Sequence, residues 1–454
     1  MDQHAEEYVE RLQALCRQPS IAAQDVGMEE TGQMVVAMLE GIGAQVQVIP
    51  TSGQPCGTGT IPQGRPVVYG HLAGAGDKTL SFYNHYDVQP PEPLEAWESD
   101  PFAAEIRQGR LYARGASDNK GDLVARICAL DAYQAVAGEL PLNVKFIIEG
   151  EEEIGSPHLG EFAQAHSDLL AADGCIWEGS YRDPRGRLEI WLGVKGICYV
   201  ELTARGARDD LHSMWATVVP NPAWRLTWAL GTLKDREERV LIPGFYDRVQ
   251  PPTEEERALL ARMEFDEEGW QERFGLPGYL LGLSGVDLLE KHIFQPTCNI
   301  CGIVSGYTGP GLKTVLPNQA KVKIDFRLVP DQDPHEVLEQ LRAHLAAQGL
   351  GDIQVELLAG EHPAKTPLDA PLAQTAIQAA RQLYDSEPVV YPMVPGTGPM
   401  YVLCQRFGIP AVSIGGVADA ASNTHAPNES IRLDDFIQGI KLAALILHRF
   451  ATST

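Results

Sequence analysis

The 454-residue sequence has no uninterrupted apolar stretch close to the roughly 18 residues that a membrane-spanning helix needs. Its first twenty residues are acidic and helical in pattern and contain no apolar leader, so we expect neither a secretion signal nor a membrane partner. Basic residues are also scarce, with 36 Lys and Arg against 61 Asp and Glu and a formal charge of −25. Such a field repels phosphate backbones, so no nucleic-acid partner is expected.

The sequence also lacks a repeated cysteine-pair motif. The eight cysteines are scattered through the chain, and most lie inside apolar runs, where a reduced cysteine behaves as a small hydrophobic residue. We therefore expect a reducing, cytoplasmic location. Cys298 and Cys301 form one CxxC, but TCNICGIVSG has the pattern of a strand. No second pair completes a zinc or redox motif.

The length of the chain exceeds one ordinary hydrophobic core, so two domains are expected. In the first part of the chain, strands alternate with helices. Residues 79–86, 142–149 and 173–178 are predicted strands, and the sequence from Asp118 onward has the apolar spacing of a helix. This alternation indicates an α/β sheet.

The pattern changes near Gly193. From there the predicted elements follow in the order β-α-β-β-α-β, which is typical of a small open-faced sandwich. After Leu368 the α/β pattern resumes. We therefore predict one discontinuous domain, residues 1–192 and 363–454, into which a second domain, residues 193–362, is inserted.

Charged side chains stand where the predicted strands end, and ligands bind at that edge of open α/β sheets. His85 and Asp87 follow one strand, and a carboxylate two residues from an imidazole can strengthen it as a metal ligand. Asp118 lies between a glycine-containing turn and a helix. Each feature alone has an ordinary alternative, because HxD pairs occur on surfaces and Asp118 could simply cap its helix.

Acidic residues end the next two predicted strands. Four carboxylates occur between Glu149 and Glu153 after the apolar LNVKFII, and Glu178 follows CIW. A solvated acidic turn is the ordinary interpretation, but a divalent cation would neutralise the cluster and leave one carboxylate as a base. His425, in the polar loop DAASNTHAPNES, adds a second imidazole. Together these residues form the donor set of a two-cation site.

These segments resemble the M20 metallopeptidases, the clan of carnosinase-like dipeptidases, tripeptidases, carboxypeptidases and N-acyl amino acid deacylases. NHYDVQP, GRLYARGASDNKGD and EGEEEIGSPHL are similar to its three metal motifs and occur in the same order. The resemblance implies a zinc-peptidase-like catalytic domain, with a mixed sheet between helices, and an inserted α+β sandwich that serves as lid and dimerisation domain. It further implies one metal on His85, Asp118 and Glu178 and another on Asp118, Glu153 and His425, with Asp118 bridging.

The resemblance also implies catalytic roles. Asp87 would orient His85, and Glu152 would be the general base on a bridging water, in the register set by the family spacing E-E-x-G-S. His212, in DLHS, is similar to a lid histidine that reaches into the partner's active site of a homodimer and stabilises the oxyanion. Zinc is the first choice for both ions, with manganese or cobalt as alternatives.

Substrate contacts are implied by resemblance to the carnosinase branch. KTVLP and DFRLVP resemble segments of that branch, which implies that Thr314 and Arg327 hold the C-terminal carboxylate of the substrate. His362 falls near a lid histidine, and Gly398 lies in PGTGP, where the branch has a Gly-Gly-Ser loop. The implied substrate is a dipeptide or short peptide. An N-acyl or N-carbamoyl amino acid is the alternative, and a non-catalytic binding protein is the third hypothesis.

Overall fold

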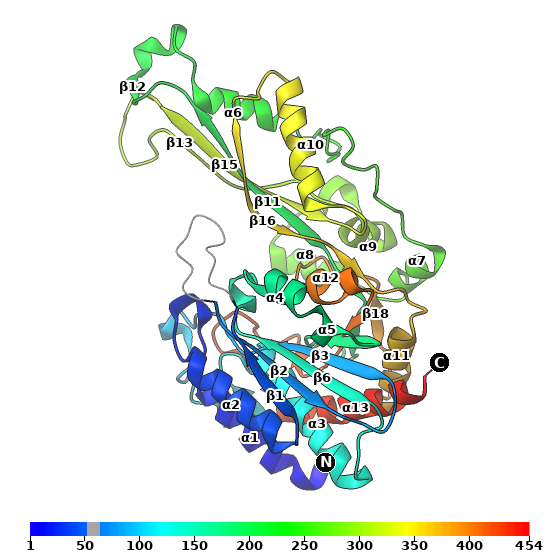
Figure 1. Ribbon diagram of the computed structural model, residues 1–454. Helices are drawn as coiled ribbons and strands as arrows, with labels where there is room; N and C mark the ends of the chain where they lie inside the picture. The colour runs from blue at the N-terminus through cyan, green and yellow to red at the C-terminus, as the bar shows by residue number, and fades with distance from the viewer. Residues whose placement is uncertain (52–63, 454) are drawn as a thin grey trace. The chain divides into compact units, whose positions relative to one another are not determined.

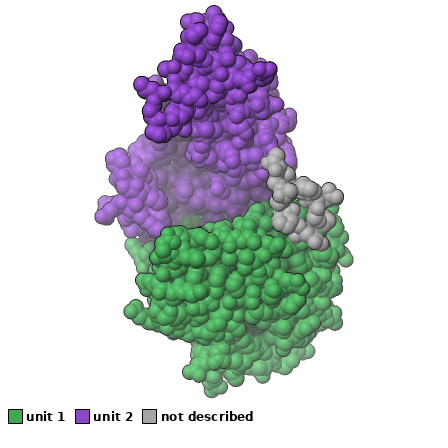
Figure 2. Space-filling view, turned by 90° about the vertical axis from the view of Figure 1, so that its left-hand side faces the viewer, with its two compact units in different colours: residues 1–193, 365–392, 399–454 green, residues 194–364, 393–398 purple. Residues whose placement is uncertain are grey.

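The computed structural model describes residues 1–51 and 64–453. The chain forms two compact units (Figures 1 and 2). The first consists of Met1–Gly193, Lys365–Pro392 and Pro399–Thr454, and the second of Val194–Ala364 and Met393–Gly398. Residues 393–398 thus group with the second unit, although the sequence pattern placed them in the first. The assignment of catalytic and lid roles to the two units stays a prediction.

An eight-stranded mixed sheet forms the centre of the first unit, in the order β1-β2-β6-β3-β7-β19-β9-β18. The four adjacent strands β6, β3, β7 and β19 run parallel, so their carboxyl ends meet at one edge. They are buried on both faces, which explains their nearly continuous apolar sequences. The strands are β1 (Gln45–Ile49), β2 (Val67–Leu72), β3 (Thr79–His85), β6 (Asn143–Glu149), β7 (Gly174–Trp177), β9 (Glu189–Trp191), β18 (Val389–Tyr391) and β19 (Ala411–Ser413).

Helices cover both faces of this sheet, as the predicted fold class requires. In Figure 1 one group, with α1, α2, α3 and α13, lies below the sheet, and a second group, with α4, α5 and α12, lies above it. α3 packs against α13, and α13 also packs against α11. The helices are α1 (Ala5–Arg17), α2 (Met28–Gly41), α3 (Gly121–Ala137), α4 (Leu159–Ala165), α5 (Ser167–Leu170), α11 (Pro371–Leu383), α12 (Met400–Leu403) and α13 (Leu433–Thr452).

The second unit is built on a four-stranded antiparallel sheet in the order β13-β15-β11-β16. Buried side chains alternate along β11 and β15 and form one core with the apolar faces of α6 and α10. The predicted β-α-β-β-α-β order is confirmed. Its elements are β11 (Gly196–Arg205), α6 (Pro222–Leu230), β13 (Asn299–Ser305), β15 (Gln319–Leu328), α10 (Pro334–Ala347) and β16 (Gln354–Glu361).

Two local features bear on the sequence predictions. Among the helices of residues 1–51 and 64–453, none is long and apolar enough to cross a membrane. The seven cysteines that the structure describes are unpaired, and only Cys301 of these is exposed. Cys56 lies outside the described residues. Cys298 packs into the core of the second unit, so the two cysteines of the CxxC lie in different environments.

Candidate metal centre

The carboxyl ends of the parallel strands carry the first predicted ligands. His85 is the last residue of β3 and pairs with Glu149, the last residue of β6. Glu178 directly follows β7. Glu152 and Glu153 begin the short 3-10 helix η5 (Glu152–Ile154) shortly after β6. All of these residues belong to the first unit.

Asp118 lies between two imidazoles at this edge. Its Oδ1 is 2.9 Å from Nε2 of His85, and its Oδ2 is 3.0 Å from Nε2 of His425. The same nitrogen of His425 is 3.2 Å from Oε2 of Glu153. The structure thus brings together four of the five predicted metal ligands, although His425 is 307 residues from Asp118 in the sequence. A carboxylate with one oxygen toward each imidazole has the arrangement of a bridging ligand.

Two groups of these side chains could each hold a metal ion. One contains Asp118, Glu153 and His425, and the other contains His85, Glu152 and Glu153; within each, the ligand atoms lie within 4.8 Å of one another. The first group matches the predicted second metal site. The second group differs from the predicted set, because Glu152 and Glu153 stand in it beside His85, where Asp118 and Glu178 were expected. The geometry by itself therefore allows Glu152 to be a ligand as well as a base.

The residues present fit a pair of divalent cations. Oε1 of Glu153 and Oε1 of Glu178 are buried, and neither has a hydrogen-bond partner among the described residues. A buried carboxylate oxygen is costly unless a partner compensates it, and a divalent cation would do so. Imidazole nitrogens with several carboxylate oxygens suit zinc and also manganese or cobalt.

The pKa values of the side chains in this site are also shifted in the direction that favours bound positive charge. Hydrogen bonds to Asp118 and Glu153 raise the pKa of His425 to about 10. Burial lowers the pKa of His85, but its hydrogen bonds to Asp118 and Asp87 outweigh this and leave the pKa well above 6.5. Burial raises the pKa of Glu178 well above its usual value, and the charge of Glu152 adds to this. These shifts favour protons on the two imidazoles and on Glu178, so a cation that binds there would release protons.

Glu152 lies in the same electrostatic environment. Burial raises the pKa of its carboxyl to about 8, and the neighbouring Asp118 and Glu153 charges raise it while His85 lowers it. Its backbone N–H donates to Oδ1 of Asp87 over 3.2 Å. This bond fixes the backbone of Glu152 at the edge of the site.

Asp87 lies against both His85 and the acidic turn. Nδ1 of His85 is 3.0 Å from the backbone oxygen of Asp87 and 3.4 Å from its carboxylate. The carboxylate oxygens instead accept the backbone N–H groups of Glu152 and Glu153. Asp87 therefore contacts both His85 and the acidic turn.

Arg126, on α3, is a supporting residue that sequence reasoning missed. It is buried, and each arm of its guanidinium donates to one strand end. Nη1 donates to the backbone oxygen of Tyr83 and to Oδ1 of Asn84, both over 2.7 Å. Nη2 donates to the backbone oxygens of Trp177 over 3.0 Å and Glu178 over 2.7 Å. Arg126 thus joins β3 to β7 beside two predicted ligands.

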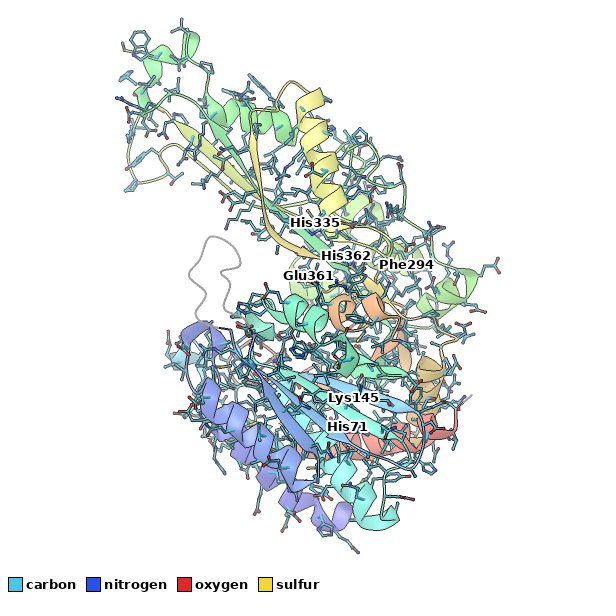
Figure 3. All side chains as sticks on the ribbon, viewed as in Figure 1. His71, Lys145, Phe294, His335, Glu361 and His362 are labelled. Carbon is cyan, nitrogen blue, oxygen red and sulfur yellow. The ribbon has the colours of Figure 1, made fainter. Side chains whose placement is uncertain are left out.

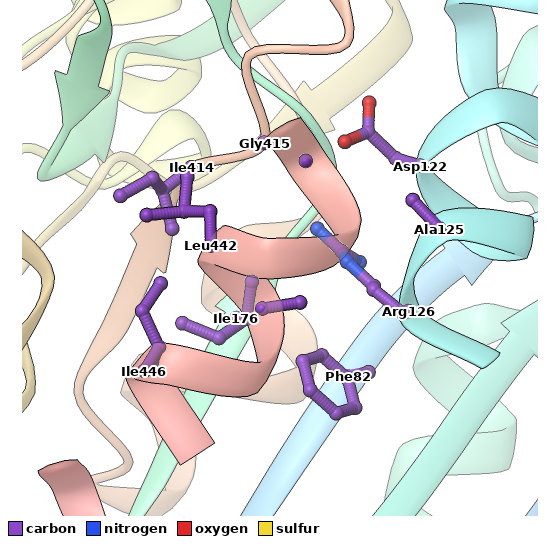
Figure 4. A pocket seen from close by; sticks show the side chains of 11 residues that line it. Phe82, Asp122, Ala125, Arg126, Ile176, Ile414, Gly415, Leu442 and Ile446 are labelled. Atoms are coloured by element: carbon purple, nitrogen blue, oxygen red, sulfur yellow. The ribbon is translucent and has the colours of Figure 1, made fainter. Parts of the chain in front are cut away.

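The surroundings of Arg126 explain why it has to pair with backbone. Figure 4 shows it between Phe82 and Asp122, at a cavity of about 10 Å³ lined mostly by apolar side chains. Burial raises the pKa of Asp122 to about 7. The only signal in the sequence is a basic residue inside the otherwise apolar helix pattern DLVARICAL.

The remaining predicted residues lie in the second unit. His212 is exposed at the end of β12 (Leu211–His212), and its Nδ1 accepts the backbone N–H of Met214 over 3.1 Å. Thr314 lies beside it, because its backbone oxygen accepts the N–H of Ser213 over 3.1 Å. β12 pairs with β14 (Val315–Leu316).

A different end of this unit carries Arg327. Its Nη1 donates to Oγ1 of Thr397 over 2.6 Å, and Gly398 is the next residue along the chain. Arg327 and Glu361 both pair with Ile197 in the sheet. His362 follows Glu361 directly, and Figure 3 labels both at the end of β16.

The second unit does not bring Thr314 and Arg327 together. On β15, Gln319 pairs with Arg205 and Arg327 pairs with Ile197, at opposite ends of β11. The eight steps along the strand from Gln319 to Arg327 span about 26 Å at the rise of an extended strand. Thr314 precedes Gln319 and lies at the far end of β15 from Arg327. Within one chain these two residues therefore cannot hold one carboxylate.

A mixed α/β sheet with two imidazoles and several buried carboxylates at its parallel strand ends is the framework of a metallohydrolase. Residues 81–449 match the model of Peptidase family M20/M25/M40. The chain belongs to this family, and it is a metal-dependent peptidase with a dinuclear type of centre.

Known relatives cover nearly the whole chain. The human Beta-Ala-His dipeptidase is 30% identical, over 98% of this chain and 90% of its own length. The Cys-Gly metallodipeptidase dug1 of Schizosaccharomyces pombe is 26% identical, over 100% and 97%. Among solved structures, the M20 family metallo-carboxypeptidase Sso-CP2 of Sulfolobus solfataricus is 40% identical, with a TM-score of 0.89 and coverage of 98% and 99%.

Proposed function

We propose that this chain is a dinuclear dipeptidase that hydrolyses the amide bond of dipeptides or short peptides. The observation that carries the proposal is Asp118, whose two carboxylate oxygens face His85 and His425 next to buried, unpartnered carboxylate oxygens. His85, Asp118 and Glu178 would hold one ion, and Asp118, Glu153 and His425 the other. We propose zinc, with manganese or cobalt as alternatives, because the donors combine imidazole nitrogen and carboxylate oxygen.

Such ions, when bound, lower the pKa of a water molecule and polarise an amide carbonyl. The residues of the chain would then manage the protons. Glu152 takes a proton from the attacking water and delivers it to the leaving nitrogen. Its fixed position, held through the backbone by Asp87, supports this role. Arg327, beside Thr397, is the proposed receptor for the substrate's carboxylate, because a guanidinium binds both carboxylate oxygens. His362 and Gly398 are proposed substrate contacts near it.

We further propose a homodimer in which the partner subunit's His212 and the partner subunit's Thr314 complete the site. The positions of Thr314 and Arg327 at opposite ends of β15 support this, since the two could meet on one substrate only if they come from different chains.

The surface of the second unit also supports a dimer. Exposed apolar side chains gather beside His212, in Met214, Trp215 and Val218, and the stacked rings of Trp224 and Trp228 stand exposed on α6. An apolar surface of this kind marks a protein interface.

We also propose that the protein works in the cytoplasm, where thiols stay reduced. The unpaired state of its seven described cysteines supports this location.

The first experiment supplies the metal-loaded protein with four substrate sets: free dipeptides, N-blocked dipeptides, longer peptides, and N-acetyl or N-carbamoyl amino acids. Mass spectrometry follows each set, with chelator-treated protein as control. Loss of free dipeptides supports the proposal and gives the side-chain preference. Release of only the C-terminal residue from N-blocked peptides would replace it with a carboxypeptidase. Loss of only the acylated amino acids would replace it with a deacylase, and turnover that survives the chelator would remove the metal from the mechanism.

A further inference from the structure

Glu429 is a buried carboxylate that bonds the residues next to the candidate metal centre. Glu429 is 1% exposed, and it lies just before β21 (Ser430–Arg432). Five hydrogen bonds end on its two oxygens. Oε1 accepts from Ser117 N (2.8 Å), Ser117 Oγ (3.0 Å) and Asp118 N (3.1 Å), and Oε2 accepts from Gly115 N (2.9 Å) and Arg114 Nη1 (2.7 Å).

These bonds fix the turn that carries Asp118. Three backbone N–H groups of this turn, those of Gly115, Ser117 and Asp118, point at one carboxylate, which makes the turn an anion-binding concavity. Gly115 has the left-handed φ of +86°, and a Cβ there would lie 2.5 Å from Val88. The turn thus depends on Gly115 for its shape and on Glu429 for its hydrogen bonds.

Glu429 also fixes the loop that carries His425. His425 lies four residues before Glu429 and has a φ of +62°, a left-handed conformation that is costly for a residue with a Cβ. Oγ of Ser117 lies 2.9 Å from Oγ1 of Thr424, the neighbour of His425. Both connections run between the Asp118 turn and the His425 loop, so they set the separation of the two side chains.

We propose that Glu429 is a positioning residue for the metal centre, which locks Asp118 and His425 into the geometry that binds the ion between them. This inference rests on the proposed metal site. It predicts that loss of the Glu429 carboxylate weakens metal binding at the group of Asp118, Glu153 and His425 rather than merely destabilising the fold. Glu429 acts through the backbone and touches no reacting atom.

The chain offers a matched control in Asp419. Its carboxylate forms a two-pronged ion pair with Arg110, at 2.7 and 2.9 Å, and it lies at the start of the same loop. Like Glu429, it joins the segment around β5 (Arg110–Tyr112) to the loop. Among the described residues, the hydrogen bonds of Asp419 run to Arg110, Ala421 and Ser422, and none of these reaches the Asp118 turn. Asp419→Asn therefore removes a comparable pair without touching that turn.

The test is calorimetric titration of Zn²⁺ into metal-free wild type, Glu429→Gln and Asp419→Asn, with unfolding by urea measured in parallel. A glutamine offers one acceptor oxygen, so some of the five donors lose their partner. We expect one ion to bind about 10- to 100-fold more weakly in Glu429→Gln, as for other residues that orient ligands, and with unchanged affinity in Asp419→Asn. Ser117→Ala, which loses one hydroxyl and keeps the turn, should show a smaller loss of the same ion.

Three outcomes would overturn the inference. Wild-type affinity in Glu429→Gln would show that the carboxylate has no part in the site. Equal losses of Zn²⁺ affinity in Glu429→Gln and Asp419→Asn would show that both residues only stabilise the loop in general. If Glu429→Gln fails to fold, an unchanged Zn²⁺ affinity in Ser117→Ala would overturn the inference. If wild type itself does not bind Zn²⁺, the proposed function fails as well. This result distinguishes a failure of the proposed function from a failure of the inference about Glu429 alone.

Discussion

Asp87 accepts the backbone N–H of Glu153, with 3.0 Å between Oδ2 of Asp87 and the nitrogen of Glu153. The other oxygen of this fully buried carboxylate accepts the N–H of Glu152 and lies 3.4 Å from Nδ1 of His85. One side chain therefore sets the distance between the end of β3 and the acidic turn. Under the proposed function, this contact would orient the clustered glutamates toward the metals.

The three consecutive glutamates should respond differently to substitution. Glu152→Gln should reduce turnover by about 10²- to 10⁴-fold, the usual contribution of a general base, and should retain both metals. Glu153→Gln should lose metal, because the orphaned buried oxygen of Glu153 needs a cation. Glu151→Gln should keep turnover, since Glu151 bonds Arg65 and His158 instead. Steady-state rates with metal analysis check this, and full turnover in Glu152→Gln would sink the assignment.

Subunit mixing should reveal whether His212 acts in trans. His212→Ala and Glu152→Gln should each be nearly inactive alone. After unfolding and refolding together they should regain about a quarter of wild-type activity, because half the dimers are mixed and each mixed dimer holds one complete site. Refolding either variant alone is the control. Sedimentation should show dimers throughout, and no recovery in proven mixed dimers would place His212 outside the partner's site.

Arg126→Met should destabilise the first unit by about 3 to 5 kcal/mol, because it removes the donor shared by four buried acceptors. Arg126→Lys should recover little, since an ammonium cannot reach both strand ends in a fork. Lys145→Met loses a hydrogen bond to Ala171 and should change the unfolding free energy by about 1 kcal/mol or less. Urea unfolding measures the stability of all three variants. Equal losses of stability in Arg126→Met and Lys145→Met would contradict the proposed role of Arg126 in joining β3 to β7.

Asp419→Asn should destabilise the protein in a pH-dependent way. Burial raises the pKa of Asp419, but the hydrogen bonds and charge of Arg110 outweigh it and hold the pKa below 3.8. The unfolded chain thus takes up this proton more readily, so the pair stabilises at neutral pH and its contribution is lost as the pH falls through the folded pKa. The variant should be about 1 to 3 kcal/mol less stable at pH 7, with a difference that shrinks toward pH 3. A constant difference across that range would contradict the ion pair.

The sequence predicted the strands and motifs of the centre because each has a local signal. Strands 79–85 and 143–149 and the helix from Gly121 came within a few residues of their predicted bounds. Apolar runs that end in charged residues mark buried parallel strands, whose ends the sheet then brings together.

Contacts between distant segments have no such signal. Arg126 and Glu429 bond mostly to backbone groups far away in the chain, and nothing in a linear pattern tells which backbone groups a buried charge will reach. The grouping of residues 393–398 with the second unit likewise depends on distant segments, because Val394 pairs with Val194.

The strand β15 separates Arg327 from Thr314 by its own length, and this has a consequence for how much enzyme a cell must make. Under the proposed dimer, a newly synthesised chain carries an unfinished site and hydrolyses nothing until it meets a second copy. While dimers are scarce, the hydrolysis rate then rises with the square of the chain concentration. Below a certain expression level, the chain would hydrolyse free dipeptides only slowly.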